Sequence, residues 1–297
     1  MVTPDHGGED VPRPESPTVR RMMLGIRLRK LRTRADVTAD DAARHIARTD
    51  STISRMETGQ SAVPTRVLER LLELYGATPE ETEEFTALAS QARQRGWWHR
   101  YGDVLHPGFE MYVGLEAEAT ELRGYGSEWV PGLLQTEAYA RAVILAQPRP
   151  PMDEEAEGRV AARMARQKIL TGDDPTHLWV VLNEAVIRRV VGGASVMREQ
   201  LEALLGKAVL RNVTLQVMPF SRGAHPAMHG EFMIMTIDLG EAAASEYVYV
   251  EHRAGSLLMD KVAELETYKL TFSHLSAEAL DSDESVAFIK RAARELD

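Results

Sequence analysis

The sequence predicts an α+β fold in two parts: an all-α head of five helices at the N-terminus and an α+β body with a mainly antiparallel sheet. Two observations support this prediction. Apolar residues recur at helical spacing through residues 20–95, with proline and glycine at the helix ends that they favour. Beyond residue 210, short β-type runs follow one another before two final helical segments, an order typical of the α+β class.

Changes in composition divide the chain further. Residues 1–19, MVTPDHGGEDVPRPESPTV, are rich in proline and acid and almost free of periodic apolar residues, so we expect a disordered tail. Residues 20–95 form the predicted helical domain. Residues 96–113 collect aromatic residues, histidine and glycine without a period, which indicates a junction. Residues 114–297 form the predicted α+β regulatory or partner-binding domain.

Each helix of the head has a recognisable pattern. In the second, Thr38 is placed to cap the N-terminus, and Asp40 and Asp41 favour its first turn. The five segments are RRMMLGIRLRKLRTRA (20–35), VTADDAARHIA (37–47), DSTISRMETG (50–59), TRVLERLLELYG (65–76) and PEETEEFTALASQARQRG (79–96).

The body alternates between the two kinds of pattern. Helices are predicted at about 114–123, 136–147, 154–171, 195–209, 261–275 and 282–296. Strands are predicted for HLWVVLN (177–183), VTLQVMPF (213–220), EFMIMTI (231–237), EYVYVEH (246–252) and GSLLMD (255–260).

The composition excludes several classes of site. The chain has 297 residues and no cysteine, so it forms no disulfide and has neither a thiolate metal site nor a cysteine nucleophile. No apolar run approaches the roughly 18 residues that a membrane span needs. We therefore expect a cytoplasmic, nucleoid-associated protein without a membrane contact.

Charge is distributed unevenly along the chain. Residues 20–70 contain 12 Lys and Arg against 6 Asp and Glu, whereas the whole chain has a net charge of −10. A basic segment on an acidic protein is typical of contact with a polyanion. The alternative is that basic helices only solvate a surface, and charge alone does not decide between the two.

The short helix at 50–59 points to the nature of that polyanion. It has two apolar side chains, Ile53 and Met56, three residues apart, which face inward. Ser51, Thr52 and Arg55 then project on the opposite side, because residues three or four apart share a face. A helix of this size fits the major groove of DNA, where arginine bonds guanine and hydroxyl groups bond bases or phosphates.

The stretch VTADDAARHIARTDSTISRMETGQSAVP resembles the helix-turn-helix of the xenobiotic-response-element regulators, the Cro/C1-type class. Thr52, Ile53, Ser54, Met56 and Glu57 fall in register with the family pattern, as does Gly59. The resemblance implies base contacts from Asp50, Ser51, Thr52, Ser54 and Arg55, helix caps at Thr38 and Thr49 among the DNA-binding positions, phosphate contacts from Gln60 and Ser61, and a structural pair of Arg32 with Glu57.

Four positions depart from the family pattern. Ala39 replaces a common glutamine, and Arg48 occupies the place of a core valine. Ala47 stands where a turn glycine is usual, so a positive φ there would cost about 1 kcal/mol or more. Asp50 puts an acid at the groove: it either accepts from cytosine N4 or caps the helix, and we favour the cap.

Longer stretches, among them WWHRYGDVLHPGFEMYVGLEAEATELRGYGSEWVPGLLQTEAYARA and LWVVLNEAVIRRVVGG, resemble an actinobacterial group of regulators called antitoxin-like or WhiJ-like. The resemblance runs from about residue 20 to the C-terminus. It implies transcription regulation and a small companion protein, encoded nearby, that the large domain binds.

The segment HPAMHGEF offers His225, His229 and Glu231 as zinc ligands. Pro226 and Gly230 argue for a loop instead of the helix that presents a His-Glu-x-x-His motif. We therefore expect polar loop contacts, and no metal or cofactor.

Trp97, Trp98 and Tyr101 either stack on exposed bases or anchor the junction to the second domain, and we favour the anchor. No phosphate-binding loop, nucleophile elbow or catalytic triad occurs, so we predict no enzyme. The sequence as a whole predicts a sequence-specific DNA-binding regulator that acts as a homodimer on double-stranded DNA. The alternative is an interaction protein that mainly sequesters a partner.

Overall fold

The computed structural model describes residues 16–94, 107–148, 150–238, 245–253 and 255–296. The chain divides into two compact units, residues 1–96 and 97–297. No helix among the described residues combines the length and the apolar composition needed to cross a membrane.

The N-terminal unit contains the five predicted helices. They are α1 (Pro17–Arg34), α2 (Ala39–His45), α3 (Asp50–Glu57), α4 (Thr65–Leu74) and α5 (Pro79–Gln91). The predicted disordered tail extends too far, because α1 already begins at Pro17. The hydroxyl of Ser16 accepts from the backbone N–H groups of Thr18 and Val19, and a proline in the first turn loses no hydrogen bond.

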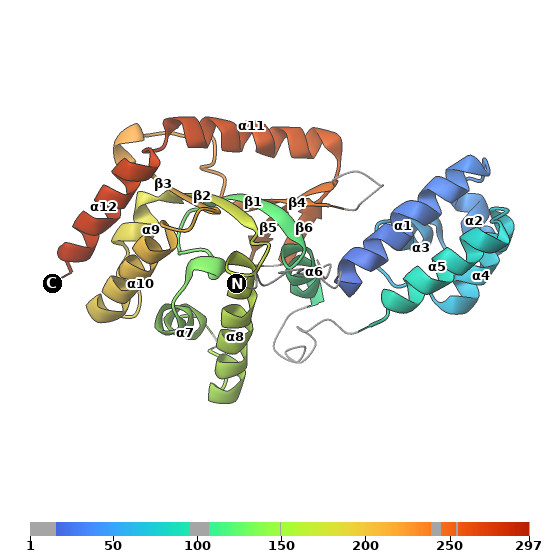
Figure 1. Cartoon of the computed structure of the whole chain (residues 1–297), viewed down its shortest axis with the longest axis horizontal. Helices are drawn as coiled ribbons and strands as arrows, with labels where there is room; N and C mark the ends of the chain where they lie inside the picture. The colour runs from blue at the N-terminus through green and yellow to red at the C-terminus, as the bar shows by residue number, and fades with distance from the viewer. Residues whose placement is uncertain (1–15, 95–106, 149, 239–244, 254, 297) are drawn as a thin grey trace, which may run out of the picture. The chain divides into compact units, whose positions relative to one another are not determined.

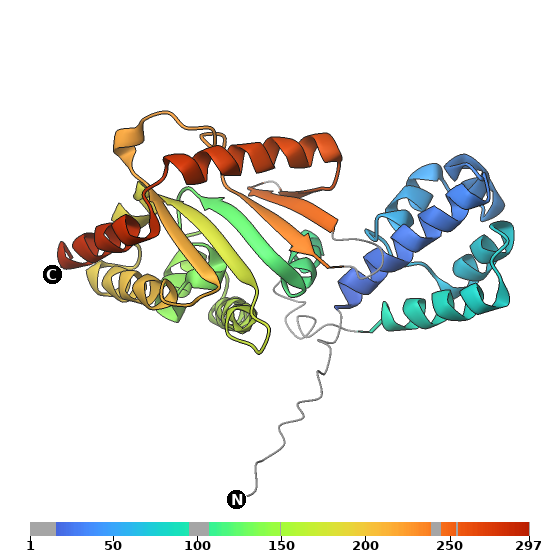
Figure 2. The ribbon, with the colours of Figure 1, turned by 45° about the horizontal axis from the view of Figure 1, so that its top comes forward.

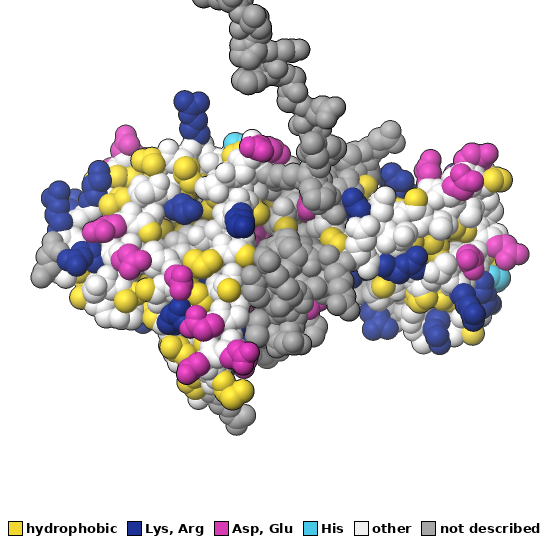
Figure 3. All heavy atoms as spheres, turned by 60° about the horizontal axis from the view of Figure 1, so that its bottom comes forward, with side chains coloured by type: hydrophobic (Ala, Val, Ile, Leu, Met, Phe, Trp, Pro, Cys, Tyr) yellow, Lys and Arg dark blue, Asp and Glu magenta, His cyan; other side chains and the backbone are white. Residues whose placement is uncertain are grey.

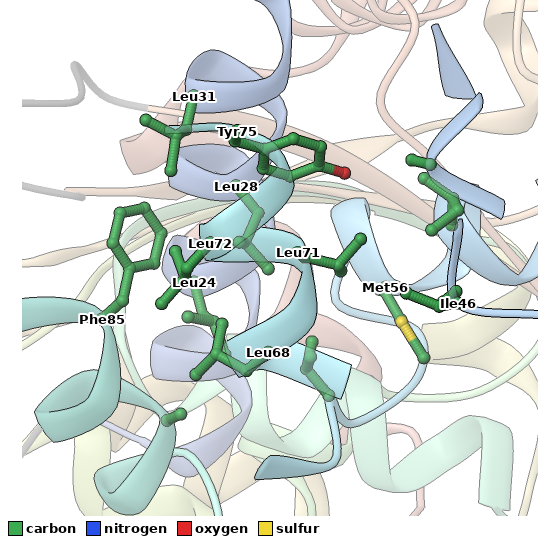
Figure 4. Close-up of a cluster of buried hydrophobic side chains, with 14 of the residues drawn as sticks. Leu24, Leu28, Leu31, Ile46, Met56, Leu68, Leu71, Leu72, Tyr75 and Phe85 are labelled. Carbon is green, nitrogen blue, oxygen red and sulfur yellow. The ribbon is translucent and has the colours of Figure 1, made fainter. Parts of the chain in front are cut away.

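Leucines from α1 and α4 dominate the core of the N-terminal unit, joined by Phe85 of α5 and Met56 of α3 (Figure 4). Ile53 of α3 is buried in the same core. The backbones of α1 and α3 approach closely at Gly25. A Cβ atom there would lie 2.5 Å from the carbonyl oxygens of both Met56 and Glu57. Glycine at this position therefore lets α3 sit directly on α1.

The C-terminal unit combines helices with one sheet. Its helices are α6 (Pro107–Glu116), α7 (Glu137–Leu145), α8 (Asp153–Arg166), α9 (Glu184–Arg188), α10 (Ala194–Lys207), α11 (Val262–Glu278) and α12 (Ser282–Arg294). Its strands are β1 (Ala119–Gly126), β2 (His177–Asn183), β3 (Val213–Met218), β4 (Phe232–Ile237), β5 (Ser245–His252) and β6 (Gly255–Met259).

The six strands form one mixed sheet in the order β3-β2-β1-β4-β5-β6. β1, β2 and β3 pair in parallel, and β1–β4, β4–β5 and β5–β6 pair antiparallel. The predicted α+β class is confirmed, and antiparallel pairs are the majority. Helix α11 covers one face of the sheet, and α7, α8 and α10 lie on the opposite side (Figures 1 and 2).

The central strand β1 corrects the sequence prediction. The pattern of residues 114–123 predicts a helix, but residues 119–126 form a strand between β2 and β4. Leu122 is fully buried, and a Cβ atom at Gly124 would lie 2.8 Å from the carbonyl oxygen of Phe232. Burial between two neighbouring strands therefore overrides the helix-forming Glu and Ala residues. The helix of this region is α6, which begins inside the predicted junction.

Candidate nucleic-acid interface

Helix α3 has one buried face and one exposed face. Ile53, Met56 and Glu57 are buried. Ser51, Ser54 and Arg55 are exposed, whereas Thr52 is half-buried. Residues 51, 54 and 55 are three and four positions apart, so they present hydroxyl and guanidinium groups side by side on the surface of the helix.

The orientation of α3 is fixed by an ion pair with α1. The guanidinium of Arg32 donates to both carboxylate oxygens of Glu57, at 2.6 and 3.0 Å, and to the carbonyl oxygen of Val37 at 2.8 Å. Both side chains are largely buried. The hydrogen bonds to Glu57 raise the pKa of Arg32 above its ordinary value, so its guanidinium stays charged. This bidentate geometry constrains the rotation of α3 about its axis.

The N-terminus of α3 differs from the prediction for Thr49. Thr49 occupies the cap position, but its hydroxyl bonds the hydroxyl of Thr52 at 3.0 Å and no backbone N–H group. Asp50 takes part in satisfying this helix end: its carboxylate accepts from the N–H of Ser51 at 2.7 Å. This contact favours the capping interpretation of Asp50 over a contact with cytosine.

The start of α2 is acidic. The hydroxyl of Thr38 accepts from the N–H of Asp41 at 3.1 Å and donates to its carboxylate at 2.5 Å, which lowers the pKa of Asp41. Arg44 bonds both Asp40 and Asp41, at 3.1 and 2.6 Å. A phosphate approaching Thr38 therefore meets two exposed carboxylates with a single arginine between them.

The turn between α2 and α3 has a left-handed residue. Ala47 has a φ of 54°, the conformation that the missing glycine would favour. The N–H of Ala47 bonds the carbonyl of Arg44, and the N–H of Arg48 bonds the carbonyl of Ala43. This is a Schellman ending of α2, and it leaves Arg48 exposed instead of in the core.

The two predicted phosphate donors in the loop between α3 and α4 differ in exposure. Gln60 is exposed. The Oγ atom of Ser61 is buried without a hydrogen-bond partner among the described residues, and its N–H bonds the carbonyl of Arg55 at 3.0 Å. The phosphate contact of Ser61 stays a prediction, and it requires the side chain to turn so that Oγ becomes exposed. Arg66, in the first turn of α4, is exposed and lies after this loop in the chain.

The positive charge of the unit lies mainly on α1, not on the helix-turn-helix. Residues 20–34 contain seven Lys and Arg and no acid, whereas residues 38–61 contain three Arg and four Asp or Glu. Several α1 arginines are engaged within the unit. Arg34 bonds Glu81 at 2.6 Å, lowering the pKa of that carboxyl to about 2, and Arg27 lies 3.7 Å from Glu84.

Five exposed cations of this unit have neither an ion-pair partner nor a side-chain hydrogen bond among the residues described. They are Arg29, Lys30, Arg48, Arg55 and Arg66. Lys and Arg side chains mix with Asp and Glu on the face of this unit that Figure 3 shows. Sequence reasoning missed Arg48 and Arg66. For Arg48 the signal was the absence of an acid three or four residues away in the chain, whereas Arg66 has Glu69 three residues later and gives no such signal.

The loop that contains His225, His229 and Glu231 was the candidate metal site. Within the described ranges, no group of three His, Asp or Glu side chains is placed to hold a metal ion. His225 instead meets the hydroxyl of Tyr125 at 3.2 Å through Nε2. Trp97, Trp98 and Tyr101 lie outside the described residues.

Comparison with family models matches both units. Residues 23–85 match a Helix-turn-helix domain, and residues 109–291, more than half of the chain, match a Domain of unknown function (DUF5753). The chain belongs to the DUF5753 family. The helix-turn-helix match covers most of α1, all of α2 to α4 and the start of α5, so this DUF5753 protein carries a DNA-binding type of domain in its N-terminal unit. Neither the curated proteins nor the solved structures gave a match.

Proposed function

We propose that this protein is a sequence-specific DNA-binding transcription regulator of the WhiJ-like kind, with α3 in the major groove. The observation that carries the proposal is the exposed face of α3. Ser51, Ser54 and Arg55 point outward on a helix whose inner face is held by Ile53 and by the ion pair of Glu57. These are side chains that read base edges, with Arg55 directed at guanine.

The proposed phosphate contacts are Arg48, Arg66 and Gln60. Arg48 precedes α3 and Arg66 follows it in the chain, and all three side chains are exposed. Phosphate contacts fix the register of the helix on DNA, and base contacts supply the preference. The start of α2, with Asp40 and Asp41, contributes little under this proposal.

The test begins with a binding site selected from random DNA by the full chain. Arg55→Ala is then titrated against that site and against a scrambled duplex, with Arg211→Ala, an exposed arginine of the C-terminal unit, as the control. Loss of a bidentate base contact costs about 1–3 kcal/mol of discrimination. We expect Arg55→Ala to lose preference for the selected site and Arg211→Ala to keep it. Equal discrimination by wild type and Arg55→Ala would refute the assignment of α3.

We propose further that the protein binds as a homodimer on two half-sites. A single short module covers little DNA, and paired modules usually read half-sites about 10 base pairs apart. Inserting about 5 base pairs rotates one half-site to the far side of the duplex, so affinity should collapse. An affinity that is independent of the insertion, together with a monomer mass in sedimentation, would argue against the dimer.

One observation favours the second candidate function, an antitoxin-like interaction protein for which DNA binding is secondary. Residues 38–61 carry more acid than base, which is unusual for a surface directed at a polyanion. Under this alternative the C-terminal domain binds a small companion protein. Binding to selected DNA no tighter than to a scrambled duplex would favour this second candidate.

A further inference from the structure

Two glutamates lie next to each other at one end of the sheet of the C-terminal unit. Met233 of β4 pairs with Tyr249 of β5. Continuing this antiparallel register by two residues puts Glu231 opposite Glu251. Like charges directly opposite each other on neighbouring strands repel, so this position is unfavourable for folding.

Both glutamates point to the side of the sheet opposite α11. Phe232 packs against Tyr268 of α11, with ring centroids 5.0 Å apart, so the preceding residue, Glu231, points to the other face. The ring of Tyr249 packs against that of Tyr112 of α6, tilted by 32° with the centroids 4.2 Å apart. Glu251, two residues further along β5, shares the face of Tyr249.

Helix α8 brings an arginine to the same side. Arg166 pairs with Glu116 at 2.6 Å and lies 5.3 Å over the ring of Tyr112, so this part of α8 faces the same layer. Arg163 is one turn earlier. Its guanidinium makes one hydrogen bond, to Oε1 of Gln135 at 2.9 Å.

These three charged groups do not neutralise one another. Within the described part of the chain, none of Arg163, Glu231 and Glu251 has an ion-pair partner. Their charges nevertheless interact. The pKa of Glu231 is raised to about 7, mainly by burial and then by the negative charges of Glu251 and Glu128. The pKa of Arg163 is lowered to about 10, mainly by burial and then by the positive charge of Arg166, whereas the negative charge of Glu251 acts to raise it.

A ligand with both charges would satisfy the three side chains together. We propose that Arg163, Glu231 and Glu251 bind a small zwitterion of the α-amino-acid type, with its carboxylate on Arg163 and its ammonium group between the two glutamates. The free donors of a largely buried guanidinium suit a carboxylate, and a cation between two neighbouring carboxylates removes their repulsion. Trp129, which is 43% exposed and follows β1, offers an apolar surface close to Glu128 and the same end of the sheet.

This inference supplies the proposed regulator with an effector and rests on the proposed function for that role only. Binding itself is tested on the full chain without DNA, so failure of the site and failure of DNA binding remain distinguishable. Proteinogenic α-amino acids are first screened at millimolar concentration for a rise in melting temperature, which ligand binding to the folded state produces.

The strongest amino acid is then compared with its two halves: the amine that lacks the carboxylate and the acid that lacks the ammonium group. We expect each half to bind about tenfold to a hundredfold more weakly, because each loses one set of charge-assisted hydrogen bonds. An amine or acid that binds as tightly as the amino acid would overturn the proposal, as would a screen in which no amino acid binds.

Glu251→Gln tests the protein side without disturbing the interior, because Glu251 is exposed; Glu202→Gln on α10 is the matched exposed control. We expect affinity to fall at least tenfold in the first variant and to stay unchanged in the second.

Calorimetry in two buffers of different ionisation enthalpy supplies a further readout, the number of protons released on binding. The ammonium group favours ionised Glu231, which faces Glu251 from β5 and Glu128 after β1, so binding near pH 7 should release protons. Unchanged affinity in Glu251→Gln would overturn the assignment.

Discussion

At the scale of single residues, one alanine and one glycine in the N-terminal unit share a left-handed backbone conformation, which is strained for the alanine and not for the glycine. Ala47 ends α2 with a φ of 54°, and Gly76 ends α4 with a φ of 66°. Both donate hydrogen bonds to the last turn of their helix. Only glycine adopts this conformation without steric cost, so Ala47 is strained and Gly76 is not.

We therefore predict that Ala47→Gly stabilises the N-terminal unit by about 1 kcal/mol. Gly76→Ala should destabilise it by a similar amount, because a Cβ atom there meets nothing within 4 Å and only the backbone penalty remains. The measurement is the opening free energy of core amides in α1 to α5 by hydrogen exchange. Changes of the same sign in both variants would contradict this account of the turn.

Glu231 makes stability depend on pH. Its folded pKa of about 7 lies above the ordinary value of 4.5, so the folded state binds the proton more tightly than the unfolded state. Stability is therefore fully present below about pH 4.5 and is lost as pH rises through about 7. One pKa unit corresponds to about 1.4 kcal/mol, so the loss is roughly 3 kcal/mol.

We expect Glu231→Gln to reduce this loss. Urea unfolding of both proteins across the range from about pH 5 to about pH 8 measures it, because the difference between the two curves isolates this one group. Parallel curves would show that Glu231 titrates normally.

At the scale of elements, one buried ion pair ties α6 to α8. Arg166 donates to both carboxylate oxygens of Glu116 at 2.6 Å, and the hydroxyl of Tyr112 donates to the same carboxylate. Phe109 and Tyr112 cover the guanidinium. Removing one partner of such a pair leaves the other charge buried and uncompensated.

Arg166→Ala should therefore destabilise the C-terminal unit by about 3–5 kcal/mol. Arg189→Ala is the matched control, because Arg189 meets Glu128 at the same 2.6 Å but both side chains are more than half exposed. Exposed pairs contribute at most about 1 kcal/mol. Urea unfolding measures both, and similar losses in the two variants would contradict the role of burial.

Comparing the elements one by one shows which of them local sequence patterns predict and which depend on the rest of the fold. The five helices of the head follow from local signals, namely caps, prolines and helical spacing, and the face of α3 follows from Ile53 and Met56. Strand β1 carries Glu and Ala in a helical spacing, and only its position between β2 and β4 makes it a strand. The juxtaposition of Glu231 and Glu251 depends on strand register, which the sequence does not encode locally.

At the scale of the whole molecule, net charge is a poor guide to DNA contact. The chain carries −10, and seven of the cations that make residues 20–70 basic lie on α1, several of them in internal contacts. Arg48, Arg55 and Arg66 are the exposed cations next to α3 in the chain. Under the proposed function, DNA binding depends on these few residues and not on the whole basic segment.

The salt dependence of binding should reflect that small number. Two cationic phosphate contacts per head, from Arg48 and Arg66, give a slope of about −2 in a plot of log affinity against log salt concentration, or about −4 for a dimer. Titrations by fluorescence anisotropy at several salt concentrations measure it. A slope near −10 for the dimer would mean that α1 also contacts DNA.

Cross-linking from the surface of α3 tests the central claim most directly. The photoreactive residue benzoylphenylalanine is introduced in place of Ser54, or in place of Glu84 on α5, whose side chain is 69% exposed, and each protein is irradiated with its selected duplex. The account predicts a covalent adduct with DNA bases from position 54 and none from position 84. An adduct from position 84 alone would contradict it, because DNA would then bind on the side of the head formed by α5.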